Sequence, residues 1–233
     1  DYKEPLFWIH LNMDYPFNLK GILYFPKVNT EYDNLEGVIK LYNNQVFIAD
    51  NIKEVIPEFL MLLKGVIDCP DLPLNVSRSA LQNDGFVKKI SDYITKKVAD
   101  KLSGMFKVDR ENYEKYWDDI SPFIKYGCLK DQKFREKMTD YLIFKDLDGK
   151  YITLPDYIEE AKKNEPAKEE TESTEAKSDE TADAENGADA DNADKEEEPT
   201  TVYYATDLQQ QSQYVNLFKE QGLNAVVLTH TID

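Results

Sequence analysis

An acidic segment limits which parts of this chain can fold. Residues 164–200 contain no aromatic residue and no Leu, Ile, Val or Met, and they hold fifteen acidic side chains against three lysines. Such a segment cannot bury enough apolar surface to offset the entropy lost on ordering, so we predict that it is disordered. It also carries most of the net charge of −17, which leaves the rest of the chain only mildly acidic.

The residues before this segment alternate between strand and helix patterns. Residues 5–14 and 19–26 are rich in aromatic and aliphatic side chains, as β-strands are. The runs 38–42 and 45–48 flank Asn43-Asn44, and because asparagine tolerates positive φ, they predict a tight hairpin. A sheet covered by helices is the fold expected from this mixture.

Helix signals are strongest in the middle of the chain. Apolar residues recur at spacings of three and four from Val87 to Phe106, which predicts one long amphipathic helix. Asp109 is a candidate N-cap for a second helix with Trp117 facing inward. We further expect a short helix from Pro57 to Gly65, a break or restart at Ser121-Pro122, and a helix end at Gly127. Asp131 is a candidate N-cap for a helix from Gln132 to Phe144, and a last helix is expected from Thr153 to about Lys163.

The chain after the acidic segment has a β-α-β pattern. Residues 201–206 and 224–229 have strand composition, and residues 208–220 between them have a helical pattern. Such a unit predicts a parallel strand pair with a right-handed crossover. Because a GxGxxG fingerprint is absent, we do not predict that this unit binds a nucleotide.

Several functional classes find no support in the sequence. No run approaches the ~18 apolar residues that span a bilayer, and the first residues lack the apolar core of a signal peptide. Cys69 and Cys128 lack zinc-site spacing and suit a reducing compartment, and His10 alone makes no metal site. The lysines between Lys88 and Lys101 indicate a solvated helix face, which could attract an acidic partner, rather than a nucleic-acid site. The sequence shows no Ser-His-Asp arrangement that would support a free-standing enzyme.

The run from Pro57 to Gln82 holds the strongest functional signal. A short strand pattern is followed by a proline-stiffened loop, and Ser79 to Gln82 fits a capping box, with Ser77 as a competing N-cap. In either case Arg78 lies beside a helix N-terminus, where free amides and the helix dipole favour an anion. A guanidinium there can pair with phosphate through two hydrogen bonds. From chemistry alone, however, a surface arginine near a helix start is the simpler interpretation.

The same run resembles the catalytic-loop region in the middle domain of the ninety-kilodalton heat-shock chaperones, above all of the bacterial HtpG type. The matched pattern is Pro-Glu-aromatic-Leu, Lys-Gly-Val-Ile-Asp, Asp-Leu-Pro-Leu-Asn-Val-Ser-Arg and Leu-Gln, in this order. In that family the arginine matched by Arg78 reaches the γ-phosphate of ATP held by a separate N-terminal domain, and the glutamine matched by Gln82 supports this contact. The resemblance implies catalytic roles for Arg78 and Gln82, and ATP-binding roles for Arg78 and Asn75.

The departures from the family pattern are local. Ser79 stands where the family usually has an acidic residue, Cys69 where it has Ser or Thr, and Leu62 where it often has Phe. The acidic segment is a larger departure, because the charged linker of the family usually precedes the middle domain. These changes leave Asn75, Arg78 and Gln82 in place.

The resemblance also implies an architecture. We expect an α/β fold of two αβα sandwich lobes joined by a short helical segment, with the disordered acidic insert in the smaller lobe. The large lobe, with the catalytic loop, would comprise residues 1–108, and the helical connector residues 109–145. The small lobe would comprise residues 146–233, with the insert at about 164–200.

The function implied is that of the middle segment of an ATP-dependent molecular chaperone in the cytoplasm. It would work with its own N-terminal ATPase domain and C-terminal dimerisation domain in a homodimer, and it would offer surface to unfolded client proteins. ATP and its magnesium ion would be held by the N-terminal domain, so this segment alone should not hydrolyse ATP. No metal site, nucleic acid or membrane is expected. The alternative is a passive α/β scaffold whose acidic segment recruits basic partners.

Overall fold

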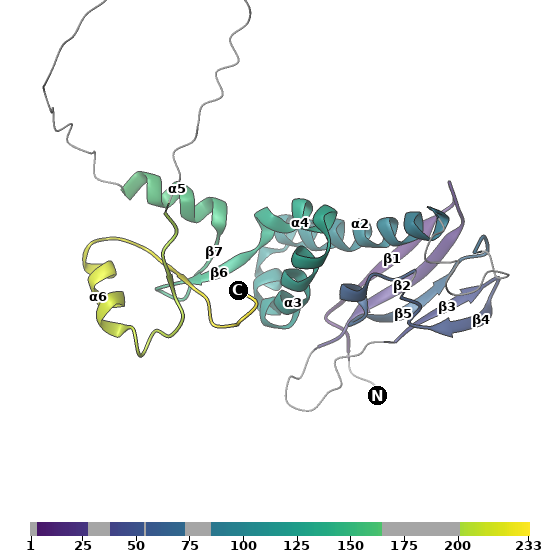
Figure 1. Ribbon diagram of the computed structural model, residues 1–233, viewed down its shortest axis with the longest axis horizontal. Coiled ribbons are helices and arrows are strands. Elements are labelled where there is room, and N and C mark those ends of the chain that lie inside the picture. The colour runs from purple at the N-terminus through teal and green to yellow at the C-terminus, as the bar shows by residue number, and fades with distance from the viewer. Residues whose placement is uncertain (1–3, 28–37, 54, 73–84, 165–200) are drawn as a thin grey trace, which may run out of the picture. The chain divides into compact units, whose positions relative to one another are not determined.

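The computed structural model describes residues 4–27, 38–53, 55–72, 85–164 and 201–233 (Figure 1). The chain forms two compact units, one of Asp1–Phe144 with Thr229–Asp233 and the other of Lys145–Leu228. Each unit combines a β-sheet with helices, which confirms the mixed α/β class expected from the sequence. The predicted division at residues 108 and 145 stays a prediction, and the acidic insert lies outside the described residues.

The first unit contains a five-stranded sheet with the order β1-β2-β5-β3-β4. Neighbouring strands are antiparallel except β3 and β5, which run parallel. Inward side chains alternate along β1, as expected for a sheet with one face against a core. Both strands predicted before residue 27 are confirmed. The strands are β1 Phe7–Met13, β2 Leu19–Phe25, β3 Ile39–Asn43, β4 Val46–Asp50 and β5 Lys64–Asp68.

The predicted hairpin between β3 and β4 is present, but its turn lies one residue later than expected. Asn44 and Gln45 have φ values of 49° and 67°, whereas Asn43 is the last residue of β3. The side chain of Asn43 is buried and 6% exposed. Because Asn43 is held in the core, the positive φ angles fall on the two residues that follow it.

Among its described residues, the first unit also contains the helices α2 (Gly85–Val108), α3 (Arg110–Lys130) and α4 (Gln132–Met138). Figure 1 shows α2 beside the strands of the sheet, and α3 and α4 beside α2. The predicted apolar face of α2 is buried from Val87 to Leu102, whereas Phe106 is half-buried. Asp109 caps α3 by accepting a hydrogen bond from the Asn112 amide, as predicted. Trp117 is 4% exposed, which confirms its inward orientation.

Two predicted helix ends are wrong for the same physical reason. Gly65 lies inside β5 and ends no helix. A Cβ atom at this position would lie only 2.3 Å from the backbone oxygen of Ile22 on β2. Gly127 lies inside α3, where a Cβ atom would lie 2.8 Å from ring atoms of Phe59 and Phe134. Both glycines permit close packing between elements that are remote in sequence.

Three further helix predictions need correction. The helix expected from Pro57 is a single 3-10 turn at Glu58–Leu60, followed directly by β5. Pro122 does not break α3, which continues to Lys130. The helix expected from Gln132 to Phe144 ends at Met138, where a 3-10 turn leads into the next strand, and Phe144 is part of that strand.

The second unit has a four-stranded sheet with the order β7-β6-β9-β8. β8 and β9 pair in parallel, which confirms the predicted β-α-β unit, although both strands are shorter than expected. Thr153 and Asp156 hydrogen-bond reciprocally at the predicted helix start. The elements are β6 Ile143–Asp146, β7 Tyr151–Thr153, α5 Leu154–Asn164, β8 Tyr204–Ala205, α6 Ser212–Glu220 and β9 Val226–Val227. Within the described ranges, no helix is both long and apolar enough to cross a membrane.

Candidate functional site

The predicted site residues Asn75, Arg78 and Gln82 lie in the segment 73–84, outside the described residues. The structure does describe both flanks of this segment. The entry flank, Cys69–Leu72, follows β5, and the exit flank is the first turn of α2. The candidate site is therefore built from the contacts that hold these two flanks.

The entry flank is held by the buried side chain of Asn43 at the end of β3. Its Nδ2 donates hydrogen bonds to the backbone oxygens of Pro70 at 3.0 Å and Leu72 at 3.1 Å. The backbone amide of Cys69 donates to the Tyr42 oxygen at 3.0 Å, which extends the parallel pairing of β3 and β5 by one bond. The four residues after β5 are thus attached to the neighbouring strand.

A second contact attaches the entry flank to the turn between β1 and β2. The carboxylate Oδ2 of Asp71 accepts hydrogen bonds from the backbone amide of Asn18 at 2.7 Å and from its Nδ2 at 3.0 Å. Asp68, the last residue of β5, accepts from the Gln45 amide at 3.2 Å through its own Oδ2. The turn between β1 and β2 therefore holds the entry flank, and the turn between β3 and β4 holds the end of β5 just before it.

The exit flank is held by the same turn between β1 and β2. The buried ring of Phe17 contacts Phe86 edge-on, with centroids 5.4 Å apart, and lies 6.3 Å from the ring of Tyr93. The Tyr93 hydroxyl donates to the backbone oxygen of Asn12 at 2.8 Å. Adjacent residues, Phe17 and Asn18, therefore contact the two described flanks, at Phe86 and Asp71.

The electrostatics of the entry flank do not favour nucleophilic chemistry. Burial raises the pKa of the Cys69 thiol to about 11, so the thiol stays protonated and unreactive at neutral pH. Asp68 keeps one buried oxygen, Oδ1, without a hydrogen-bond partner in the part of the chain that the structure describes. The described flank is therefore suited to hold a loop, not to react.

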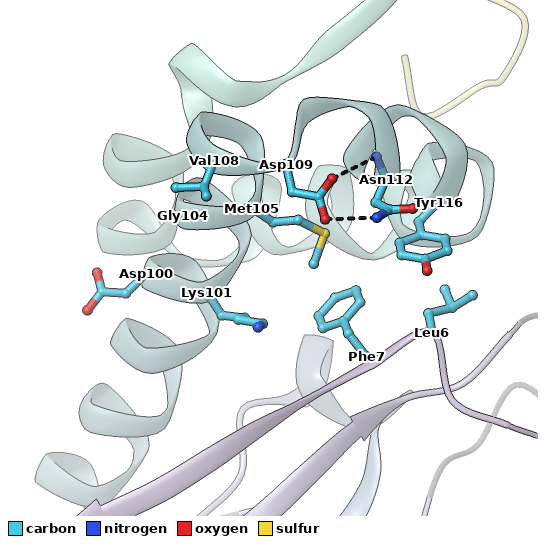
Figure 2. Close-up of a pocket in the computed structure, with 10 residues that line it drawn as sticks. All are labelled: Leu6, Phe7, Asp100, Lys101, Gly104, Met105, Val108, Asp109, Asn112 and Tyr116. Atoms are coloured by element: carbon cyan, nitrogen blue, oxygen red, sulfur yellow. Dashed lines mark hydrogen bonds between the residues drawn. The ribbon is translucent and has the colours of Figure 1, made fainter.

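A hollow of about 420 Å³ lies in the first unit between the start of β1 and the junction of α2 and α3. Figure 2 shows that the Asp109 carboxylate at its edge is engaged by Asn112 of α3. Asp100 pairs with Lys137 of α4. These two carboxylates of the hollow therefore serve helix capping and ion pairing, so neither is a candidate catalytic group. Among the described residues, no cluster of His, Cys, Asp or Glu could hold a metal ion.

The residues that hold the flanks were not predicted as site residues. Asn43 was assigned to a turn, although strand alternation places it on the same face as Ile39 and Leu41. A polar side chain at the third position of such a buried face is a signal that it bonds to backbone groups inside the protein. Asn18 and Asp71 gave no such signal, because both are common turn residues.

The fold of this chain can be compared with those of solved structures. It is similar to the middle domain of a heat shock protein from Plasmodium falciparum, with a TM-score of 0.65 over 99% of this chain and 80% of that chain. The two sequences are 20% identical, so this similarity shows the fold alone. The fold of this chain is therefore that of a heat-shock-protein middle domain.

The family follows from sequence comparison. The family model described as "Hsp90 protein" matches residues 1–167. Chaperone protein HtpG of Porphyromonas gingivalis is 55% identical over 155 residues, which are 66% of this chain and 23% of that protein. HtpG of Bacteroides fragilis is 52% identical over 166 residues, 71% of this chain and 24% of that protein. The chain belongs to the Hsp90 family, and it spans about a quarter of the length of these curated relatives.

Proposed function

We propose that this chain is the middle segment of an ATP-dependent molecular chaperone and that it presents Arg78 to the γ-phosphate of ATP bound in an N-terminal domain of the same protein. The family membership and the match from Pro57 to Gln82 support this function. The observation that carries it is the anchoring of the two described flanks, Asp71 to Asn18 and Phe86 to Phe17. Flanks held on a packed sheet are suited to a side chain that must act at a defined point.

The chemistry assigned to this chain is limited to positioning charge. The Arg78 guanidinium would donate two hydrogen bonds to γ-phosphate oxygens when the domains close, and Asn75 and Gln82 would support that contact. ATP and its magnesium ion would be held by the N-terminal domain. In this arrangement the chain contributes electrostatic stabilisation to a transition state formed on another domain.

The remaining partners are proposed on the basis of family membership. The full-length protein would form a homodimer through a C-terminal domain, would act in the cytoplasm, and would bind unfolded client proteins in part through this segment. The relatives at 52–55% identity are chaperones by name, which supports this assignment.

The test is the replacement of Arg78 by Ala in the full-length protein. We expect ATP turnover to fall at least about tenfold while ATP affinity stays nearly unchanged, because Arg78 meets the nucleotide only on the way to the transition state. Arginines delivered to phosphate in GTPases contribute about 10³–10⁵ in rate. We expect less here, because domain closure limits turnover in many such enzymes. Arg78→Lys should restore little, since an ammonium lacks the planar fork, and Gln82→Ala should show a weaker loss.

The matched control is Arg135→Ala, which removes an exposed arginine of α4. This control should leave both turnover and affinity unchanged. Unchanged turnover in folded Arg78→Ala protein would refute the proposed function and favour the passive scaffold.

A further inference from the structure

The hollow of about 420 Å³ in the first unit is walled on one side by α2. Gly104, Met105 and Val108 lie three, four and seven residues after Lys101, so all four share one side of the helix. The buried ring of Phe7, at the start of β1, lies across the hollow from Met105, as Figure 2 shows. The centre of the hollow is therefore apolar.

Gly104 leaves space in this wall. Glycine in the interior of a helix lowers its stability relative to alanine, and close packing against another element is the usual reason to keep it there. Gly127 of α3 has such a reason, since a Cβ atom there would lie 2.8 Å from ring atoms of Phe59 and Phe134. A Cβ atom on Gly104 would meet no described atom of another element within 4 Å. Gly104 therefore keeps the hollow open, and packing within the described chain does not account for it.

The hollow is positively charged at one end. Figure 2 shows the Lys101 side chain directed toward Phe7 and Asp100 directed away from it. Lys101 has no ion-pair partner among the residues with described positions, whereas Asp100 is paired with a lysine of α4 at 3.0 Å. Asp109 caps α3 eight residues after Lys101, or about 12 Å further along the helix axis. An anionic group is therefore attracted to the Lys101 end of the hollow and repelled at the Asp109 end.

The size and lining of the hollow suit a small molecule. Small-molecule sites have volumes of about 300–1,000 Å³, a mostly apolar lining and a few placed polar groups, and this hollow lies in the lower part of that range. A phosphate group is bound by several donors, whereas Lys101 offers a single ammonium group. A singly charged carboxylate attached to an apolar body is therefore the better match.

We propose that this hollow binds a small carboxylic acid with an aromatic or branched aliphatic body. The carboxylate would pair with the Lys101 ammonium group, and the body would lie between Phe7 and Met105, in the space beside Gly104. This inference goes beyond the proposed function and does not depend on it, because all four residues lie outside the run from Pro57 to Gln82.

The experiment is a titration of 4-phenylbutyrate into the chain labelled with ¹³C at its methionine methyl groups. The chain has four methionines, so each methyl signal can be assigned by replacing one methionine with leucine. We expect the Met105 signal to shift and to saturate at low-millimolar ligand, the order expected for a ligand of about a dozen heavy atoms. The signal of the fully buried Met138 should stay in place and shows that the chain remains folded. Absence of a saturable shift at Met105, at ligand concentrations about tenfold higher, would overturn the inference.

A charge reversal tests the role of Lys101. Lys101→Glu replaces attraction with repulsion at an exposed position, so we expect 4-phenylbutyrate to bind about tenfold more weakly. The neutral analogue 4-phenyl-1-butanol should bind this variant and the unchanged chain equally well. Lys96→Glu is the matched control, because Lys96 is an exposed lysine of α2 that does not line the hollow, and it should leave the binding of both compounds unchanged. Equal weakening by Lys96→Glu and Lys101→Glu would show non-specific charge attraction and would overturn the inference.

Gly104→Leu tests the space beside the glycine. The new Cβ atom meets no other element and leucine favours a helix, so the chain should stay folded. Because the leucine side chain would occupy the hollow next to Met105, we expect the binding of both compounds to be lost. Unchanged binding in folded Gly104→Leu would place the ligand elsewhere and refute the proposed site. If this variant does not fold, the comparison of Lys101→Glu with Lys96→Glu decides.

Discussion

At the scale of single residues, Trp117 is a main contributor to the core of the first unit. It is buried on α3 beside Tyr113, with ring centroids 5.6 Å apart. We expect Trp117→Ala to lower the free energy of unfolding by roughly 3–5 kcal/mol, the usual cost of removing a large buried side chain. Urea unfolding measures this loss. Asp118→Ala, an exposed change at the next residue, should stay within about 0.5 kcal/mol. A loss below about 1 kcal/mol for Trp117→Ala would contradict its burial.

The residues show what sequence reasoning can reach. The inward orientation of Trp117 and the apolar face of α2 follow from spacing within one helix, and both are confirmed. The roles of Gly65 and Gly127 cannot be predicted from local spacing, because each depends on an element that is remote in sequence. Asn43 is an intermediate case. The alternation along the strand shows on which face of the sheet its side chain lies, but not to which carbonyl groups it donates hydrogen bonds.

At the scale of elements, α4 depends more on its cap and its core contact than on its ion pairs. Asp131 accepts a hydrogen bond from the Phe134 amide at 2.7 Å, and the side chain of Phe134 is fully buried. Lys133 and Lys137 pair with Asp92 and Asp100 of α2, but these pairs are exposed. Exposed ion pairs contribute little and are screened by salt.

We expect Asp131→Ala to lower the free energy of unfolding by about 1 kcal/mol, the typical effect of losing an N-cap. High salt should leave this loss in place, because the bond to the Phe134 amide is local. Denaturant unfolding at low and high salt measures it, with Asp140→Ala as a control that removes an exposed carboxylate from the turn after α4. If Asp140→Ala lowers the free energy of unfolding as much as Asp131→Ala does, loss of the cap does not account for the effect.

Element ends are less predictable from sequence than element faces. The cap at Asp109 could be predicted because its partner lies three residues away. Pro122 was expected to break α3, yet the helix continues through it to Lys130. The candidate site shows the same limit, because the contacts that anchor its flanks join positions far apart in the chain, such as Asn18 and Asp71.

At the scale of the whole molecule, the acidic segment should contribute little to stability. It supplies no apolar side chain larger than alanine to either core. We expect deletion of residues 165–198 to change the melting temperature by less than about 2 °C, a shift that corresponds to about 0.5–1 kcal/mol for a chain of this size. Circular dichroism measures it, and a Gly/Ser segment of equal length is the control for loop length. A drop of several degrees would show that the segment packs against the fold and that the predicted boundaries are wrong.

The two buried cysteines make this protein convenient for spectroscopic labelling. Burial raises the pKa of both the Cys69 and Cys128 thiols to about 11, so neither presents a reactive thiolate at neutral pH. A fluorophore or spin label directed at a new surface cysteine would therefore react there selectively, with both native cysteines left in place. The surroundings of any labelled surface position can thus be followed in a chain whose core is unaltered.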